Sequence, residues 1–412
     1  FNGVNIDSRA IEPGQLFVAL TGPRFDGHDY LDQVAAKGAV GALVEREMPG
    51  SALPQLIVSD TRKALAQLGA MNRNAFVDKP VAAITGSSGK TTVKEMLASI
   101  LSTRGPVLAT KGNLNNELGV PLTLLALAPE FDAAVIELGA NHVGEIALTV
   151  SLTQPHVSVL TNAGTAHVGE FGGPEKIVEA KGEIIEGLNA QGTAVLNRDD
   201  KAFGIWVARA GARKVLSFSM HNSEADFYAS NLGIDARGCP TFMLNGPSGS
   251  AQVQLNLLGA HNVANALAAA AAAYALDVSL PGIVTGLNNV QPVKGRTVAQ
   301  LATNGIRVID DTYNANPSSV AAATDILAGF SGRTVLVLGD IGELGDWAEQ
   351  GHRDVGEYAA GKVDALYAVG PLMAHAVKAF GQDARHFANQ ADLIEALRAE
   401  QDKNTTLLIK GS

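Results

Sequence analysis

The 412-residue sequence contains a single cysteine, Cys239. One cysteine excludes a disulfide within the chain and favours a reducing, cytoplasmic compartment. Basic residues are also scarce, because 31 Lys and Arg stand against 41 Asp and Glu and give a net charge of −10. This balance argues against nucleic acid as a partner, since nucleic-acid binders need a basic surface that displaces counterions. We therefore expect anionic ligands to be bound by local cationic groups such as Lys90, Arg9 and Arg296.

Long apolar runs are absent as well, and the longest covers the eleven residues 266–276. A run of this length is too short to cross a bilayer and predicts a buried helix, so no membrane span is expected. The chain starts at Phe1 rather than at Met, and it stops at Ser412 directly after a predicted strand. We expect the start to be trimmed and the last domain to be truncated.

The hydrophobic pattern predicts an α/β protein of three domains. Residues 1–78 read as a small N-terminal α/β domain. Residues 79–293 alternate strands and helices, which predicts a central, mostly parallel sheet covered on both faces. Within them, residues 226–257 favour antiparallel hairpins, and residues 256–276 favour a long alanine-rich helix. Residues 294–412 alternate again and predict a Rossmann-like C-terminal domain.

The strongest chemical signal is a glycine-rich turn between a predicted strand and a predicted helix. It reads Thr85-Gly86-Ser87-Ser88-Gly89-Lys90-Thr91-Thr92. Such a turn binds a polyphosphate with its backbone N–H groups and the positive end of the helix, so we expect residues 86–92 to hold ATP or GTP. Lys90 would reach the outer phosphates and the Thr91 hydroxyl would hold Mg²⁺. The strict motif has glycine where this chain has Ile84, so a glycine turn without a ligand is the alternative.

Three residues follow the predicted central strands or lie on a nearby helix. Glu137 ends a strand, and its carboxylate would lie beside the phosphate loop as a Mg²⁺ ligand, unless it is only an exposed strand-end acid. His167 follows the next strand and is a candidate ligand for a second metal or a bridging water, although a lone histidine is more often structural. Lys181 lies on a predicted helix, where the pattern alone suggests a solvated face.

A polar loop at residues 111–121 carries three asparagines, Asn113, Asn115 and Asn116. Their amides supply paired donors and acceptors that suit a sugar or a peptide backbone. The alternative is a helix-connecting loop with asparagine caps. The density of asparagines favours a ligand-binding loop.

Four further polar residues stand at predicted helix starts or strand ends. Asn262 and Asn265 open the alanine-rich helix and would suit an adenine edge, or else serve as a cap or a core amide. Asp311 and Asn314 follow a predicted strand, which again places them at a ligand edge or in a capped turn. Arg296 lies at the expected hinge before the last domain, from which it would reach a phosphate.

Taken together, these motifs resemble the Mur ligase family of ATP-dependent peptidoglycan enzymes. The resemblance covers nearly the whole chain and includes Asp7-Ser8-Arg9, Asp26-Gly27-His28, residues 111–121, Ala180-Lys181-Gly182-Glu183, residues 259–265 and residues 310–317. It implies a UDP-substrate domain, a central ATPase and a C-terminal domain that closes on ATP. It also implies ATP and Mg²⁺ as cofactors, with Ser8 and Arg9 in contact with the uridine diphosphate.

The resemblance further implies the metal ligands. Thr91 and Glu137 would hold a first Mg²⁺, and His167 with Lys181 would hold a second. For this role Lys181 is expected to be carbamylated, because a carbamate is a carboxylate-like ligand whereas a free ammonium would be repelled. Lys90 and Arg296 would neutralise charge on the transferring phosphoryl group.

Within the family, the Ser-Ser of the phosphate loop and the Lys-Gly-Asn-x-Asn-Asn loop resemble the member that adds D-alanyl-D-alanine. The implied reaction is an amide ligation of this dipeptide to UDP-N-acetylmuramoyl-tripeptide through an acyl phosphate, by a cytoplasmic monomer. A sister ligase that adds the third peptide residue is one alternative, although its usual Thr-Asn-Gly-Lys-Thr loop differs. An unrelated phosphate-loop kinase or GTPase is another, but a guanine motif of the type Asn-Lys-x-Asp is absent. A non-catalytic nucleotide-binding module is the third.

Overall fold

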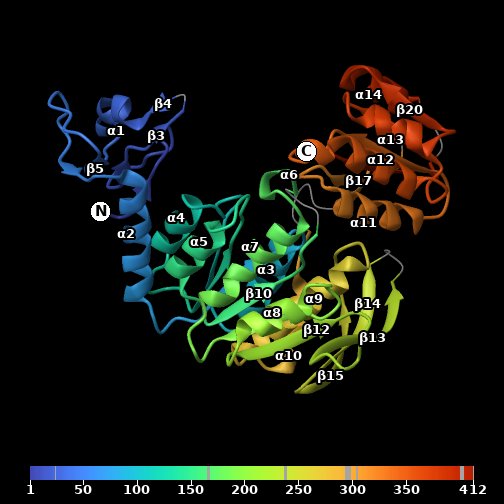
Figure 1. Cartoon of the computed structure of the whole chain (residues 1–412), viewed down its shortest axis with the longest axis horizontal. Coiled ribbons are helices and arrows are strands. Elements are labelled where there is room, and N and C mark those ends of the chain that lie inside the picture. Colours follow the sequence, from blue (N-terminus) through green and yellow to red (C-terminus); the bar gives the residue numbers. More distant parts are fainter. Residues whose placement is uncertain are drawn as a thin grey trace.

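The computed structural model of the chain describes residues 1–23, 25–164, 168–235, 239–292, 298–302, 305–399 and 403–411. Figure 1 shows three α/β lobes, coloured blue for the N-terminal lobe, blue-green through green to yellow for the central lobe and orange to red for the C-terminal lobe. The predicted three-domain α/β architecture is confirmed, whereas the limits 78/79 and 293/294 stay a prediction. His167 and Arg296 lie outside the described residues.

The N-terminal lobe contains a parallel four-stranded sheet in the order β1-β2-β5-β6. Its elements are β1 (Val4–Asn5), β2 (Leu16–Val18), the hairpin β3 (Thr21–Gly22) and β4 (Phe25–Asp26), η1 (Gly27–Tyr30), α1 (Leu31–Ala36), β5 (Gly41–Val44), β6 (Gln55–Ile57) and α2 (Thr61–Ala75). Asp60 caps α2 by accepting a hydrogen bond from the Lys63 N–H at 3.0 Å. Helix α2 packs against α4 of the central lobe and joins the two lobes.

The central lobe is built on a nine-stranded sheet in the order β15-β14-β13-β12-β11-β10-β7-β9-β8. Its strands are β7 (Val81–Thr85), β8 (Val107–Ala109), β9 (Ala133–Glu137), β10 (Val157–Leu160), β11 (Thr193–Asn197), β12 (Lys214–Ser219), β13 (Phe227–Ile234), β14 (Pro240–Gly246) and β15 (Gly249–Gln254). Strands β8 to β13 pair in parallel, whereas β13, β14 and β15 form antiparallel pairs, which confirms the hairpins predicted for residues 226–257.

Helices cover both faces of this sheet because its strands are apolar on both sides. The helices are α3 (Lys90–Leu101), α4 (Gly119–Leu125), α5 (Glu145–Thr153), α6 (Val168–Phe171), α7 (Pro174–Glu186), α8 (Phe203–Ala210), α9 (His261–Ala275) and α10 (Leu280–Asn289). Along β7, Ala82 and Ile84 face the core beneath α3, α9 and α10, whereas Val81 and Ala83 face the core beneath α4, α5 and α7. This alternation follows from the two-residue repeat of a strand.

The alanine-rich helix starts later than predicted. It begins at His261 rather than at residue 256. Leu255, which follows β15, still bonds to the sheet, because its N–H donates to the carbonyl of Pro240 in β14 at 3.0 Å. The run of small side chains from Ala268 to Ala273 is fully buried, which lets α9 lie close to the sheet and to α3.

The C-terminal lobe has a six-stranded sheet in the order β16-β17-β21-β18-β19-β20, parallel except for β16. Its elements are β16 (Val298–Leu301), β17 (Arg307–Asp311), α11 (Pro317–Ala328), β18 (Thr334–Gly339), η2 (Gly345–Trp347), α12 (Ala348–Ala359), β19 (Ala365–Val369), α13 (Met373–Phe380), β20 (Ala384–Phe387), α14 (Gln390–Arg398) and β21 (Thr406–Lys410). The last strand, β21, therefore inserts between β17 and β18. In the described part of the chain, no helix combines the length and apolarity that a membrane span requires.

Candidate active site

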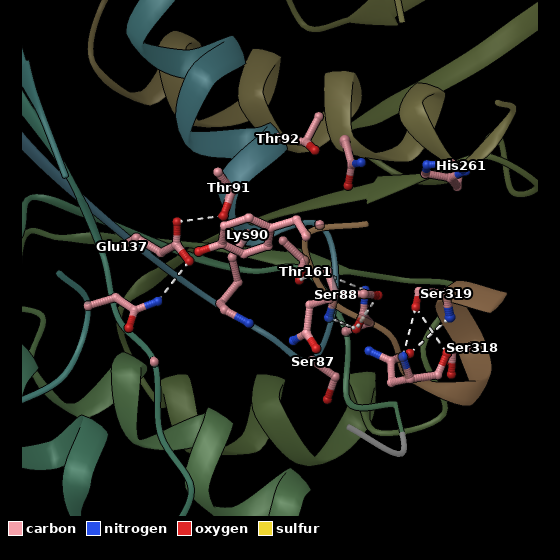
Figure 2. Close-up of a pocket in the computed structure, with 18 of the residues that line it drawn as sticks. Ser87, Ser88, Lys90, Thr91, Thr92, Glu137, Thr161, His261, Ser318 and Ser319 are labelled. Carbon is pink, nitrogen blue, oxygen red and sulfur yellow. Dashed lines mark hydrogen bonds between the residues drawn. The ribbon is translucent and has the colours of Figure 1, made fainter. Parts of the chain in front are cut away.

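A cavity of about 780 Å³ lies between the central and C-terminal lobes. The carboxyl ends of β7, β9 and β10 form one wall, where ligands of parallel sheets usually bind. The start of α11 and the end of β21 form the opposite wall, and Figure 2 shows side chains of both lobes facing the cavity. The predicted site residues that line it are Ser87, Ser88, Gly89, Lys90, Thr91, Thr92, Asn113, Asn115, Asn116, Glu137, Lys181, Asn265, Asp311 and Asn314.

The predicted phosphate loop joins β7 to α3 and requires two glycines for different reasons. Gly89 has φ +81° and precedes the first residue of α3, which has no side-chain cap. Gly86 has φ +147°, and a Cβ at this position would collide with Oγ1 of Thr161. Ile84, which replaces the first glycine of the strict motif, is fully buried in the core of the sheet. The departure from the motif therefore lies in the strand and leaves the turn itself intact.

The end of β10 holds the phosphate loop in place. The Ser88 N–H donates to Oδ1 of Asn162 at 3.0 Å, and the Thr161 hydroxyl donates to the Ser88 carbonyl at 2.6 Å. Nζ of Lys90 donates to the Gly86 carbonyl at 2.7 Å, so the ammonium lies across the loop. Sequence reasoning missed Asn162. Its position two residues after the end of a central parallel strand was the available signal.

Thr91 and Glu137 meet beside Lys90. The Thr91 hydroxyl donates to Oε2 of Glu137 at 2.8 Å, and Nδ2 of Asn115 donates to Oε1 of the same carboxylate at 3.0 Å (Figure 2). Glu137 is 3% exposed, so it is not the exposed strand-end acid that was the alternative. A hydroxyl and a carboxylate oxygen at this separation form a donor set that suits Mg²⁺, and the outer phosphates of a nucleotide would complete it.

Lys181 points from α7 toward the cavity and is only 1% exposed, so the solvated helix face that its sequence pattern suggested is wrong. Its Nζ donates to the Ala140 carbonyl at 3.3 Å. Burial, reinforced by the positive charge of Lys90, lowers the pKa of Lys181 to about 7, although Glu145 and Glu183 act in the opposite direction. An amine with this pKa is partly neutral near pH 7 and is therefore nucleophilic.

Among the residues that the structure describes, no group of three or more His, Cys, Asp and Glu side chains could by itself hold a metal ion. A cation at this site would therefore depend on the Thr91 hydroxyl, on Glu137 and on oxygens that a ligand brings. The predicted partnership of His167 with Lys181 falls outside the described residues. Its geometry stays a prediction.

The three asparagines of the polar loop have different surroundings. Asn115 supports Glu137, as described above. Asn116 accepts hydrogen bonds from the N–H groups of Leu118 and Gly119 at 3.2 and 2.9 Å, so its side chain caps the start of α4. Asn113 is exposed and lines the cavity. Asn116 therefore fits the alternative prediction of an asparagine that caps a helix, whereas Asn113 fits the prediction of a ligand-binding loop because it is exposed at the cavity.

Asn262 and Asn265 lie in the first turns of α9. Nδ2 of Asn262 donates to the Leu258 carbonyl at 2.8 Å, and Nδ2 of Asn265 donates to Oδ1 of Asn262 at 2.8 Å. Both side chains are nearly buried, and only Asn265 lines the cavity. Oδ1 of Asn265 lies so close to Gly89 that a Cβ there would collide with it. The amide of Asn265 therefore lies beside the phosphate loop, whereas the amide of Asn262 is bonded to the backbone that precedes α9.

The C-terminal wall contains a buried ion pair that sequence reasoning missed. Nζ of Lys410 pairs with Oδ2 of Asp311 at 2.7 Å and donates to the Asn314 carbonyl at 2.9 Å. The two charged side chains are 4% and 13% exposed. Lys410 ends a parallel strand, as Glu137 does, and that position was the signal that could have identified it.

Ser8 and Arg9 lie in the N-terminal lobe and do not line this cavity. The exposed Arg9 guanidinium pairs with Asp7 at 2.8 Å, and its hydrogen bonds lower the pKa of the Asp7 carboxyl to about 2. Nζ of Lys37 donates to the carbonyls of Ser8 and Arg9 at 3.1 and 2.7 Å. The turn at residues 7–9 is therefore held by the Arg9–Asp7 pair and by Lys37, so a ligand bound there would contact a preformed surface.

Comparison with known proteins identifies the family. Three family models match the chain: the "Mur ligase family, catalytic domain" over residues 1–73, the "Mur ligase middle domain" over residues 84–273 and the "Mur ligase, glutamate ligase domain" over residues 295–412. The UDP-N-acetylmuramoyl-tripeptide–D-alanyl-D-alanine ligase of Escherichia coli (strain K12) is 47% identical over 416 residues, which cover 100% of this chain and 91% of the relative. The enzyme of the same name from Bacillus subtilis (strain 168) is 34% identical, over 100% and 90%.

Solved structures agree with this assignment. A crystal structure of MurF from Acinetobacter baumannii superposes with a TM-score of 0.94 at 44% identity, and the match covers 99% of this chain and 90% of that one. The MurF ligase of Thermotoga maritima in complex with ADP superposes with a TM-score of 0.90 at 28% identity, over 100% and 94%. From its sequence and its structure alike, the chain belongs to the Mur ligase family.

Proposed function

We propose that this chain joins D-alanyl-D-alanine to UDP-N-acetylmuramoyl-tripeptide, with conversion of ATP to ADP and phosphate, in peptidoglycan precursor synthesis. Enzymes named for this reaction match the chain over its whole length, at 47% and 39% identity for those of Escherichia coli and Haemophilus influenzae. Binding of ADP by a MurF ligase with the same fold supports ATP as the nucleotide. The observation that carries the proposal is the cavity in which the phosphate loop, Glu137 and Lys181 come together.

The reaction starts when the terminal carboxylate of the tripeptide attacks the γ-phosphorus of ATP. The bond from that phosphorus to the bridging oxygen breaks, ADP leaves and an acyl phosphate forms. Lys90 and the N–H groups at the start of α3 stabilise the charge on the transferring group. The neutral amine of D-alanyl-D-alanine then attacks the acyl carbon and loses a proton, and the tetrahedral intermediate collapses to an amide as phosphate leaves. Arg296 stays a proposed further cation for the phosphoryl group.

The Thr91 hydroxyl and the Glu137 carboxylate fit Mg²⁺, because hard oxygen donors that are 2.8 Å apart can ligate one small cation. When bound, Mg²⁺ would neutralise charge on the outer phosphates. Asn115 holds the carboxylate from its other oxygen, so Glu137 is oriented toward Thr91. His167 stays a proposed ligand of a second cation.

Carbamylation of Lys181 is part of this proposal. A neutral amine attacks the carbon of CO₂ and loses a proton, and the product carries a carboxylate-like head at the same position. Burial lowers the pKa of Lys181 to about 7, so a neutral amine is present under ordinary conditions. The modified residue would offer negative oxygen donors to the cavity, in place of an ammonium that repels cations.

The lobes divide the substrates between them. Ser8 and Arg9 of the N-terminal lobe are proposed contacts of the uridine diphosphate, and Asn113 is a proposed contact of the substrate near the phosphate loop. The acyl phosphate must be kept from water, which requires the C-terminal lobe to close over the nucleotide. The two lobes already approach each other in this structure, because a Cβ added at Gly164 would touch both Ser87 of the phosphate loop and Ser318 of α11.

We further propose domain limits at 78/79 and 293/294, a monomer, and a cytoplasmic location where ATP and the UDP-linked substrate are found.

Release of phosphate tests the function directly. The proposed ligase releases phosphate from ATP only when both UDP-N-acetylmuramoyl-tripeptide and D-alanyl-D-alanine are present. A phosphate-loop kinase or GTPase would turn over without the UDP-linked peptide, and a sister ligase would require a shorter peptide and a single amino acid. Turnover that does not depend on the dipeptide would refute the proposed reaction.

A further inference from the structure

A closed ring of hydrogen bonds ties Glu137 back to the phosphate-binding helix. The Thr91 hydroxyl of α3 donates to the Glu137 carboxylate at 2.8 Å (Figure 2). The backbone N–H of Glu137 donates to Oγ1 of Thr110 at 2.9 Å. The Thr110 carbonyl accepts from Nζ of Lys94 at 2.7 Å, and Lys94 lies one helical turn after Thr91. The ring therefore begins and ends on α3 and includes the two proposed ligands of the first cation, Thr91 and Glu137.

Lys94 is an unusual residue for its position. It is 2% exposed, although the other buried residues of α3, apart from Thr91, are apolar. Its ammonium is paired at 2.9 Å with Glu95, a partly exposed neighbour. Removing an ammonium from water is unfavourable, and an apolar side chain of similar length would pack there without this penalty. Besides the pair with the partly exposed Glu95, a lysine at this position supplies the buried hydrogen bond to the Thr110 carbonyl, which an apolar side chain cannot make.

Thr110 uses each of its polar groups in this arrangement. It is 1% exposed and directly follows β8. Its N–H donates to the Val135 carbonyl of β9 at 3.1 Å, its hydroxyl accepts from Glu137 and its carbonyl accepts from Lys94. The polar loop of residues 111–121 starts at the next residue, and its Asn115 donates to the other carboxylate oxygen of Glu137. A shift of Thr110 would therefore move Glu137 through its backbone and through its side chain.

We propose that Lys94 and Thr110 are positioning residues that set the separation between the Thr91 hydroxyl and the Glu137 carboxylate, and thereby the affinity of this site for a divalent cation. The inference rests on the cation site proposed above. Lys94 acts only through Thr110, and neither is a proposed ligand of the nucleotide or of the cation. Removal of comparable supporting hydrogen bonds in metal sites weakens metal affinity by roughly 10–100-fold.

The test compares Thr110→Val, which removes the hydroxyl and keeps the shape, with Thr110→Ser, which keeps the hydroxyl, and with Lys94→Met. Calorimetric binding of ADP is measured without Mg²⁺ and at rising Mg²⁺, so the readout does not require turnover. In Thr110→Val and Lys94→Met, the Mg²⁺ concentration that half-saturates the effect on ADP binding should rise by about tenfold, while binding without Mg²⁺ changes by less than about twofold. Thr110→Ser should resemble the parent protein.

Arg104→Met is the matched control, because Arg104 lies in the turn that follows the far end of α3 and donates there to the Leu276 carbonyl at 2.9 Å. It should lower thermal stability and leave the Mg²⁺ dependence unchanged. A parent-like Mg²⁺ dependence in Thr110→Val overturns the inference, as does an equal shift in Arg104→Met. If Lys94→Met does not fold, the Val and Ser variants of Thr110 decide. If Mg²⁺ does not change the affinity of the parent protein for ADP, that result refutes the proposed cation site itself.

Discussion

The guanidinium of Arg73 in α2 donates from Nε to the Thr153 carbonyl at the end of α5, at 2.9 Å. Arg73 is 1% exposed and also donates to the carbonyls of Phe76 and Gln154, at 2.7 and 3.1 Å. One arginine of the N-terminal lobe thus caps a helix of the central lobe. The other end of α5 begins at Glu145, which lines the cavity. This contact fixes the N-terminal lobe relative to the candidate active site.

Arg73→Met should therefore destabilise the joint between these lobes. The substitution removes three hydrogen bonds in a water-poor interface, although the Phe76 carbonyl still accepts from the Lys79 N–H. The loss of about 3 kcal/mol should lower the unfolding temperature by roughly 6–12 °C. Differential scanning calorimetry measures the change. Arg62→Met is the control on the same helix, because the Arg62–Glu117 pair is about half exposed and contributes at most about 1 kcal/mol. Equal shifts in the two variants would contradict the role of Arg73.

Glu137→Ala should impair chemistry much more than recognition of the UDP-linked substrate. The variant loses a carboxylate that meets Thr91 at 2.8 Å, so turnover should fall by at least about 100-fold while the dissociation constant of the UDP-linked substrate changes by less than about twofold. Steady-state phosphate release and equilibrium binding give the two values. Glu130→Ala, in the exposed segment before the same strand, is the control. A parallel loss of both properties would indicate unfolding instead.

Lys181→Ala should remove most activity and keep the fold, because the proposed carbamate is lost from the cavity wall. Added formate, a small carboxylate, should restore part of the turnover by occupying the vacated position. Circular dichroism and the unfolding temperature establish that the fold is retained. Full activity in the unsupplemented variant would refute the proposed role of the residue.

Carbamylation of Lys181 should follow pH in a defined direction. Carbon dioxide reacts with the neutral amine, and burial lowers the pKa of Lys181 from 10.5 to about 7. The neutral form therefore grows as pH rises through 7, whereas an ordinary lysine would stay protonated until about pH 10. With ¹³C-bicarbonate at a constant CO₂ concentration, the carbamate signal in NMR should rise between about pH 6 and 8. A signal that is flat in this window, or that persists in Lys181→Ala, would contradict the assignment.

The phosphate loop could be predicted because its signals are local. Strand, glycine turn, Lys90, Thr91 and helix follow each other within one short segment, and each has a conformational preference of its own. Glu137 could be placed with nearly equal ease, because a residue that ends a parallel strand lies at the same sheet edge as its neighbours. The hairpins of residues 226–257 were accessible for the same reason, since turn residues mark their ends.

The environment of Lys181 and the pair of Lys410 with Asp311 could not be predicted in this way. Charged neighbours along α7 suggest a solvated face, but Lys181 is buried, with its ammonium 5.1 Å from the centre of the Phe171 ring and bonded to the Ala140 carbonyl. Lys410 and Asp311 are far apart in sequence and meet only because β21 inserts between β17 and β18. Contacts of this kind depend on strand order, which local patterns do not specify.

Gly89→Ala gives the sharpest test of the phosphate loop. The residue has φ +81°, where a side chain is disfavoured by roughly 1–2 kcal/mol, and a Cβ would collide with Oδ1 of Asn265. The loop must shift, so ADP affinity measured by calorimetry should fall by at least about tenfold. Gly204→Ala is the control, because that site in α8 has open space and gains up to about 1 kcal/mol of stability from alanine. Parental ADP affinity in Gly89→Ala would mean that this turn does not bind the phosphates.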